Sequence, residues 1–265
     1  MYDAALHQCR AWFDRFCRSF AMPVREDQRN LDLKEEHTGR VRKNALRIAA
    51  GLGLDAQDAA LAEIIALFHD VGRFPQYRDY RTFRDSESVN HAALGAKVLI
   101  EQDALADLPK SEQDLVVRAV TLHNVFTLPR SLEPRTALHA RIIRDADKLD
   151  IWRIFAEILE QPGAERPSAA GLGLPETPEY APGILEQLRR REMVRLTSLG
   201  TLNDFKLLQL AWVYDLNFLP SLRMVRERGV IGRLSATLPG DDAVLSAVDA
   251  VRQYVDERIA EQSVP

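Results

Sequence analysis

The chain has 265 residues, of which 46% are hydrophobic, and its formal net charge at pH 7 is −4. A chain of this length and hydrophobicity can bury a substantial core as one large domain or as two small ones. The acidic balance provides no basic footprint for a nucleic acid polymer. No stretch approaches the ~20 apolar residues that span a bilayer, so we expect no membrane partner either.

Cysteine usage and the first residues indicate the compartment. Cys9 and Cys17 have no spacing typical of a disulfide framework or a metal finger. The first twenty residues mix acidic and basic side chains and lack the uninterrupted apolar stretch of a signal peptide. We therefore expect a cytoplasmic protein.

Apolar residues recur every three or four positions through the first 70 residues, which predicts helices. The first predicted helix runs between positions 6 and 20 and ends before Pro23. The second carries an inward stripe of Leu33, His37, Val41, Ala45 and Ile48. Asp55, followed three residues later by Asp58, predicts the start of a third helix, which is apolar almost all round and therefore buried.

The rest of the chain is also expected to be helical, with two irregular segments. Residues 73–88 are polar and are predicted to form a loop, and residues 162–183 are rich in Pro and Gly and are predicted to form a linker or an ordered loop. Helices are predicted over 91–99, from a cap at Ser111 to about position 128, over 135–159, and again through 184–265. The last has an apolar stripe from Leu245 to Ile259. No stretch alternates long enough for a sheet.

Four of the six histidines form an ordered set with two aspartates. The set is His37, the pair His69-Asp70, His91, His123 and Asp147. Imidazole and carboxylate together favour a transition metal with open positions. Asp147 shares a helical face with Ile143 and Ile151, and an ionised carboxylate buried without a partner is very costly. A metal or a buried cation is the simplest compensation, and a helical bundle commonly holds such a site in its core.

Five segments carry a family resemblance. They are LKEEHTGRVRKNALRIA, ALFHDVGRFPQY, NHAALGAKVL, AVTLHNVF and IIRDADKLDIW, in this order across about residues 30–155. Together they resemble the HD superfamily of metal-dependent phosphohydrolases, in its bacterial, uncharacterised branch. The resemblance implies an all-α, HD-domain-like helical bundle with extra N- and C-terminal helices. We expect one domain over residues 1–265, with its core at about 30–155.

The same resemblance implies roles for the ordered set. His37, His69, Asp70 and Asp147 would hold a metal, while His91 and His123 match positions that bind a second metal or contact the phosphate. Asp70, His91 and His123 would be the catalytic residues. The implied cofactor is one or two divalent transition metal ions, drawn from Mn, Fe, Co, Ni or Zn, with Mg left open.

Two basic residues near this set are candidate substrate contacts. Arg73 lies three residues after Asp70, and it either recognises phosphate or belongs to a solvated loop. Lys148 follows Asp147 directly, and it either reaches a substrate phosphate or pairs with Asp145. Both are predicted to bind substrate.

The sequence therefore predicts an enzyme that hydrolyses a phosphate ester, phosphoanhydride or phosphodiester, with a nucleotide among the candidate substrates. The expected partner is a small phosphorylated substrate, and a homodimer is left open. Two alternatives remain: a di-iron oxygenase of HD type, and a non-catalytic ligand-binding or regulatory HD module. The filled ligand positions disfavour the regulatory module.

Overall fold

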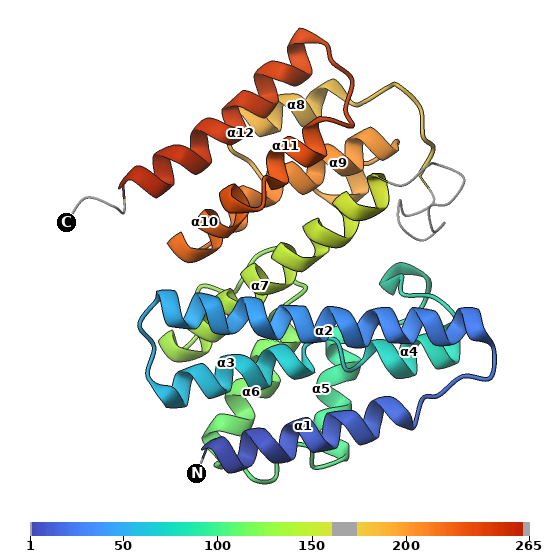
Figure 1. Cartoon of the computed structure of the whole chain (residues 1–265), viewed down its shortest axis with the longest axis vertical. Helices are drawn as coiled ribbons and strands as arrows, with labels where there is room; N and C mark the ends of the chain where they lie inside the picture. Colours follow the sequence, from blue (N-terminus) through green and yellow to red (C-terminus); the bar gives the residue numbers. More distant parts are fainter. Residues whose placement is uncertain (1, 161–173, 262–265) are drawn as a thin grey trace. The chain divides into compact units, whose positions relative to one another are not determined.

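A computed structural model describes residues 2–160 and 174–261 of the chain (Figure 1). These residues form helices joined by turns and short irregular segments, and the described part contains no β-strand. The predicted all-α class is confirmed. Within the described ranges, no helix has both the length and the apolar character that crossing a bilayer requires.

The chain divides into two compact units, residues 1–147 and 148–265. The boundary falls inside α7 (Pro134–Leu159). The single domain predicted over residues 1–265 stays a prediction.

Unit 1 is built from helices of very different length. They are α1 (Tyr2–Arg18), α2 (Arg25–Gly51), α3 (Ala56–Phe68), α4 (Arg73–Tyr80), α5 (His91–Glu101), α6 (Lys110–Leu122) and the first part of α7, with a short 3₁₀ turn η1 (Asp85–Glu87). Helices α2 and α3 pack along each other, α1 lies against α3, and α5 pairs with α6 (Figure 1).

Helix α3 is the centre of unit 1, as its nearly uniform apolar sequence predicts. Every residue from Ala60 to Phe68 is buried. The predicted N-terminal signal is present, because the Asp55 carboxylate accepts a hydrogen bond from the backbone N–H of Asp58 at 2.8 Å. Aromatic rings of α1 cover its C-terminal end, with Trp12 and Phe13 meeting Phe68 edge to face.

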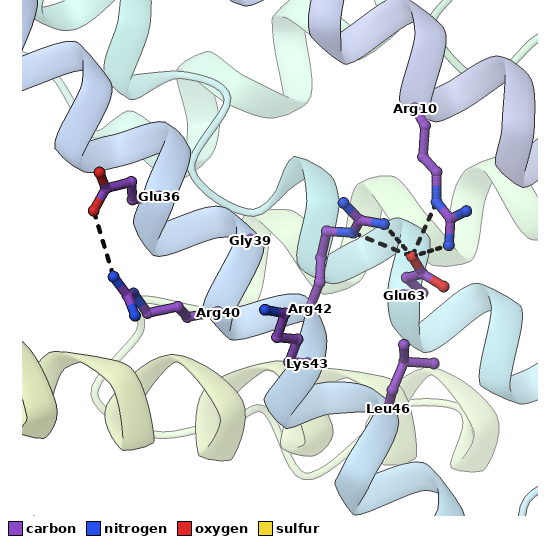
Figure 2. A pocket seen from close by; sticks show the side chains of 8 residues that line it. All are labelled: Arg10, Glu36, Gly39, Arg40, Arg42, Lys43, Leu46 and Glu63. Carbon is purple, nitrogen blue, oxygen red and sulfur yellow. Dashed lines mark hydrogen bonds and ion pairs between the residues drawn. The ribbon is translucent and has the colours of Figure 1, made fainter.

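Glu63 is the one acidic residue in that buried run. Its side chain is 4% exposed, and its Oε1 accepts hydrogen bonds from Arg10 of α1 and Arg42 of α2, each through Nε and Nη2 (Figure 2). Burial by itself raises the pKa of Glu63, but the hydrogen bonds from Arg42 and Arg10 outweigh it and hold the pKa below its ordinary value. The carboxylate therefore links three helices in its charged form.

The segment after the His-Asp pair is helical where a loop was predicted. Helix α4 starts at Arg73, and Pro75 stands in its first turn, where the missing N–H is not needed by the helix. Phe74 and Tyr77 are buried, and the Tyr77 hydroxyl donates to Asp27 of α2 at 2.8 Å. Tertiary packing thus stabilises a helix that could not be predicted from the polar composition of the segment. Beyond α4 the segment is irregular apart from η1.

Other local expectations were wrong at single residues. Leu33, predicted on the inward stripe of α2, is 53% exposed, whereas His37 and Val41 are buried. Ser111 does not cap α6, which begins one residue earlier behind Pro109 and ends at Leu122 rather than near position 128.

Close packing of Gly72 fixes the approach of α4 to α5. A Cβ placed on Gly72 would lie 2.1 Å from the carbonyl oxygen of His91 and 2.6 Å from the backbone nitrogen of Gly95. Real Cβ atoms do not come this close to backbone atoms, so only glycine fits. Gly72, two positions after Asp70, therefore allows the chain to pack closely against the start of α5, where His91 lies.

Unit 2 contains the second part of α7 and the remaining helices. They are α8 (Pro182–Arg189), α9 (Leu202–Ala211), α10 (Leu219–Glu227), α11 (Val230–Ser235) and α12 (Asp242–Glu261), with 3₁₀ turns η4 (Leu196–Ser198) and η5 (Trp212–Asp215). Helix α12 packs along α8 and also contacts α10.

The predicted boundaries of this region hold in part. Residues 162–173 of the predicted Pro/Gly-rich loop lie outside the described residues, and α8 begins at Pro182 rather than 184. Asp241 caps α12 by accepting from the N–H groups of Ala243 and Val244. Leu245, expected on the buried stripe, is 49% exposed.

The buried carboxylate of Glu63 gives a stability prediction. Replacing Glu63 by Gln keeps the shape but leaves two guanidinium groups without their counter-charge. Because both arginines are partly exposed, we expect a loss of about 1–3 kcal/mol in the free energy of unfolding at pH 7. Urea unfolding measures this loss.

The loss should also depend on pH. The folded-state pKa of Glu63 is depressed, so its contribution is complete above the ordinary value of 4.5 and disappears as pH falls through the folded-state value. The difference between wild type and Glu63→Gln should therefore shrink below about pH 4.5. Glu36→Gln is the control, since its pair with Arg40 is exposed and should contribute less than about 0.5 kcal/mol. Equal effects of the two substitutions at pH 7 would contradict the prediction.

Candidate metal centre

The six predicted ligands come from five helices of unit 1 or from the residues that follow them, and five of the six form two buried groups that share Asp70. His37 lies in the middle of α2, His69 and Asp70 follow the last turn of α3, and His91 is the first residue of α5. His123 directly follows α6, and Asp147 lies in α7. All four histidines and Asp70 are at most 5% exposed. The ends of α3 and α6, the start of α5 and the interiors of α2 and α7 therefore bring residues from 37 to 147 together.

The first donor group surrounds one oxygen of Asp70. Nε2 of His37 and Nε2 of His69 are 3.3 Å apart, and they lie 3.8 and 3.9 Å from Asp70 Oδ2. Asp147 Oδ1 lies 3.1 Å from the first nitrogen and 3.7 Å from the second. Donors that share an ion at 2.0–2.2 Å lie at most about 4.4 Å apart, and all of these separations are shorter.

The second donor group surrounds the other oxygen of the same carboxylate. Nε2 of His91 and Nε2 of His123 are 3.0 Å apart and lie 3.3 and 3.9 Å from Asp70 Oδ1. Asp70 thus belongs to both groups. Both histidines are buried and face the same centre as Asp70, as the sequence predicts.

Hydrogen bonds on the far side of the rings determine which nitrogen faces the centre. Nδ1 of His69 lies 2.8 Å from the carbonyl oxygen of Ala66, and Nδ1 of His123 lies 2.8 Å from that of Val120. A carbonyl oxygen only accepts, so Nδ1 carries the proton in both rings. In the neutral ring, Nε2 then presents a lone pair to the centre, as in histidines that ligate metals.

Asp85 likewise determines which nitrogen of His91 carries the proton. Its Oδ2 lies 2.7 Å from Nδ1 of His91. Burial alone raises the pKa of Asp85, but the hydrogen bond and charge of His91, with Arg73 and Gln76, lower it to about 2. The carboxylate is ionised at neutral pH and accepts, so His91 also presents the lone pair of Nε2 inward.

The burial of the rings favours their neutral forms. Burial lowers the pKa of His123 to about 3, and the neighbouring His91 and His69 act in the same direction. Burial also lowers the pKa of His91, against the opposing effect of Asp85. For Asp70, burial raises the pKa, but Lys34, His69 and Arg73 hold it well below its usual range.

The lone pairs of the second donor group are arranged as in a site that binds a cation. His91 and His123 present nitrogen lone pairs to each other at 3.0 Å, beside the ionised Asp70, and a neutral ring has no proton to place between them. Such an arrangement repels itself unless a positive ion lies among the donors. The nitrogen and carboxylate donors suit Mn, Fe, Co, Ni or Zn.

The two predicted substrate contacts lie in different surroundings. Arg73 lies at the centre, with its Nε 3.4 Å from Asp70 Oδ1, while its Nη1 donates to Gln76, Asp85 and the carbonyl of Phe83. Lys148 is the first residue of unit 2, and its ammonium pairs with Asp215 of the same unit at 2.7 Å.

Sequence reasoning missed two residues of the centre. Lys34 places its Nζ 2.9 Å from Asp70 Oδ2 and 5.2 Å from the centre of the Phe83 ring. It precedes His37 by three residues, and this spacing on a helix could have identified it. Asp85 carried no such signal, because its contact with His91 depends on the turn after α4.

One comparison with known proteins identifies a family. The model of the HD domain family matches residues 35–152, a range that includes all six donors. No curated protein and no solved structure matches the chain. The matched range agrees with the predicted core at about 30–155, and the HD-type helical fold is confirmed. The chain therefore contains an HD domain over residues 35–152.

Proposed function

We propose that this chain is a metal-dependent phosphohydrolase that acts on a phosphate ester, phosphoanhydride or phosphodiester. The observation that carries the proposal is the pair of donor groups that share Asp70 within an HD domain. HD domains are typically metal-dependent hydrolases, and the donors of this chain suit a divalent transition metal.

In this proposal, His37, His69, Asp70 and Asp147 hold one metal ion. Asp70, His91 and His123 form the second group, which holds a second ion or contacts the substrate directly. A bound metal would supply a Lewis acid that polarises a phosphoryl oxygen and makes water more acidic near neutral pH.

The protein side chains then have separate tasks. One carboxylate oxygen of Asp70 accepts a hydrogen bond from the attacking water and so orients it. In the absence of a second ion, the Nε2 lone pairs of His91 and His123 are placed to accept a proton from the attacking water, and the ring that takes it up can then pass it to the leaving oxygen. Asp85 keeps His91 in position, because the hydrogen bond at Nδ1 fixes both the tautomer and the plane of the ring.

Lys34 and Arg73 supply positive charge beside the reacting group. Each lies next to one oxygen of Asp70, at 2.9 and 3.4 Å, and a phosphoryl group brings negative charge to the same place. The Lys34 side chain is 22% exposed, so its ammonium is within reach of an entering substrate. Arg73 is held by three acceptors through Nη1, which makes it a fixed charge. The role proposed for Lys148 stays a prediction.

A di-iron oxygenase is the alternative enzyme class, since its ligands overlap with these donors. Oxygen uptake by an iron-loaded sample, without phosphate release from any substrate, would favour it. A purely regulatory HD module would bind its ligand and metal but turn over neither class of substrate.

The first test is the Asp70→Asn variant, assayed with a panel of nucleotides and phosphoesters. Asn is nearly isosteric but lacks the charge that both donor groups share, so we expect activity to fall by roughly two or more orders of magnitude. Chelator treatment of wild type should have a similar effect, reversed by adding metal. Circular dichroism should show the helical content unchanged. Equal activity of wild type, variant and chelated protein would refute the proposal.

Lys34 gives a second test. Lys34→Ala should lower kcat/KM by about 10- to 100-fold, because one charge-assisted contact to the phosphoryl group is lost. The metal content, measured by elemental analysis, should stay the same. Lys97→Ala removes an equally charged but exposed side chain of α5 and should leave kcat/KM unchanged. If Lys34→Ala instead loses the metal with unchanged kcat/KM per bound ion, Lys34 only stabilises the site.

A further inference from the structure

Unit 1 contains a cavity that none of the six metal-centre donors lines. It has a volume of about 450 Å³ and lies where α1, α2 and α3 meet (Figure 2). Its charged lining residues are Arg10, Glu36, Arg40, Arg42, Lys43 and Glu63. A volume of this size is typical of small-molecule sites.

The residues that line this cavity are mainly basic, whereas the chain as a whole is acidic. Four cations and two carboxylates line it, which leaves an excess of two positive charges, whereas the whole chain has a net charge of −4. One of the two carboxylates, Glu63, is buried and already engaged by two guanidinium groups. The cavity therefore offers mainly positive charge to whatever enters it.

Two of the guanidinium groups are held in place before any ligand arrives. Arg10 and Arg42 both use Nε and Nη2 to bind Glu63, as the dashed lines in Figure 2 show. Among the described residues, Nη1 of neither arginine has a hydrogen-bond partner. A fixed guanidinium loses little entropy when it binds a phosphate oxygen, which favours recognition of phosphate.

The remaining cations are available to a ligand. Within residues 2–160 and 174–261, Arg40 pairs only with Glu36, at 3.4 Å and on an exposed helix face, and pairs of this kind contribute little. Lys43 is exposed and has no ion-pair partner within the described ranges. Gly39, directly before Arg40, also lines the cavity, and a Cβ placed there would have no heavy atom within 4 Å.

We propose that this cavity binds a small phosphate-bearing anion at a site separate from the metal centre. Arg10 and Arg42 form its fixed part, and Arg40 and Lys43 close on the ligand from α2. This site does not depend on the chain being a phosphohydrolase, since it uses none of the metal-centre donors.

Pyrophosphate is the probe, and isothermal titration calorimetry on the full chain is the measurement. The protein is treated with chelator first, so that no metal contributes to binding. We expect chelated wild type to bind pyrophosphate, with an affinity that falls as salt is added. The double variant Arg40→Ala/Lys43→Ala should bind at least about tenfold more weakly, because two charged contacts are lost. Neither residue bonds Glu63, so the fold should persist, and circular dichroism checks this.

Two matched variants make the result specific. Lys97→Ala/Lys110→Ala removes the same charge from exposed positions of α5 and α6 and should bind like wild type. Lys34→Ala removes a cation of the metal centre and should also bind like wild type. The proposal is overturned if chelated wild type does not bind millimolar pyrophosphate, if the Arg40/Lys43 variant binds as tightly as wild type, or if Lys34→Ala alone abolishes binding.

Discussion

A single carboxylate, that of Asp70, joins the two donor groups of the metal centre. One oxygen faces His37 and His69, the other faces His91 and His123, and each oxygen also has one cation beside it. Because both groups depend on the same side chain, its position must be fixed more precisely than that of any other ligand. Asp70 is the second residue after the end of α3, whose residues from Ala60 to Phe68 are all buried, and this packing provides that precision.

Three of the other ligands are fixed by contacts that do not involve a metal. Backbone carbonyls hold the rings of His69 and His123, and Asp85 holds His91. Gly72 lets α4 approach the start of α5. The buried Asn44 side chain of α2 donates to the carbonyl of Ala146, next to Asp147. The site is therefore preorganised, and the binding of an ion need not order the side chains.

The sequence predicted most of the site because ligand chemistry is local in character. His37, the His69-Asp70 pair, His91, His123 and Asp147 could be identified from their order and residue type. What could not be predicted depends on contacts between segments. Asp85 matters only because the chain after α4 returns it to His91, and a polar segment shows no periodicity that would reveal this. Lys34 was identifiable from its helical spacing to His37, and it was missed because the basic residues predicted to contact substrate, Arg73 and Lys148, were those that follow Asp70 and Asp147 in the sequence.

The fold, like the site, could be predicted where the sequence pattern is local and could not be predicted where it depends on contacts between segments. Strong apolar patterns gave α1, α2 and α3 correctly, whereas α4 was hidden because its stability comes from two buried aromatic residues and a tyrosine hydrogen bond to α2. At the next level, Leu33 shows that one residue of a helical stripe can face solvent where the neighbouring helix does not reach. Sequence patterns predict which helices form, whereas tertiary packing determines which residues of each helix are buried.

The position of the bound metal tests the central claim most directly. A crystal of the full chain grown or soaked with Mn²⁺ should give an anomalous peak within about 2.0–2.3 Å of His37, His69, Asp70 and Asp147. A second peak among Asp70, His91 and His123 would show a two-ion centre, and its absence would leave those two histidines facing the substrate. Mn²⁺ bound only elsewhere on the protein, with the Asp70 oxygens free of it, would contradict the account.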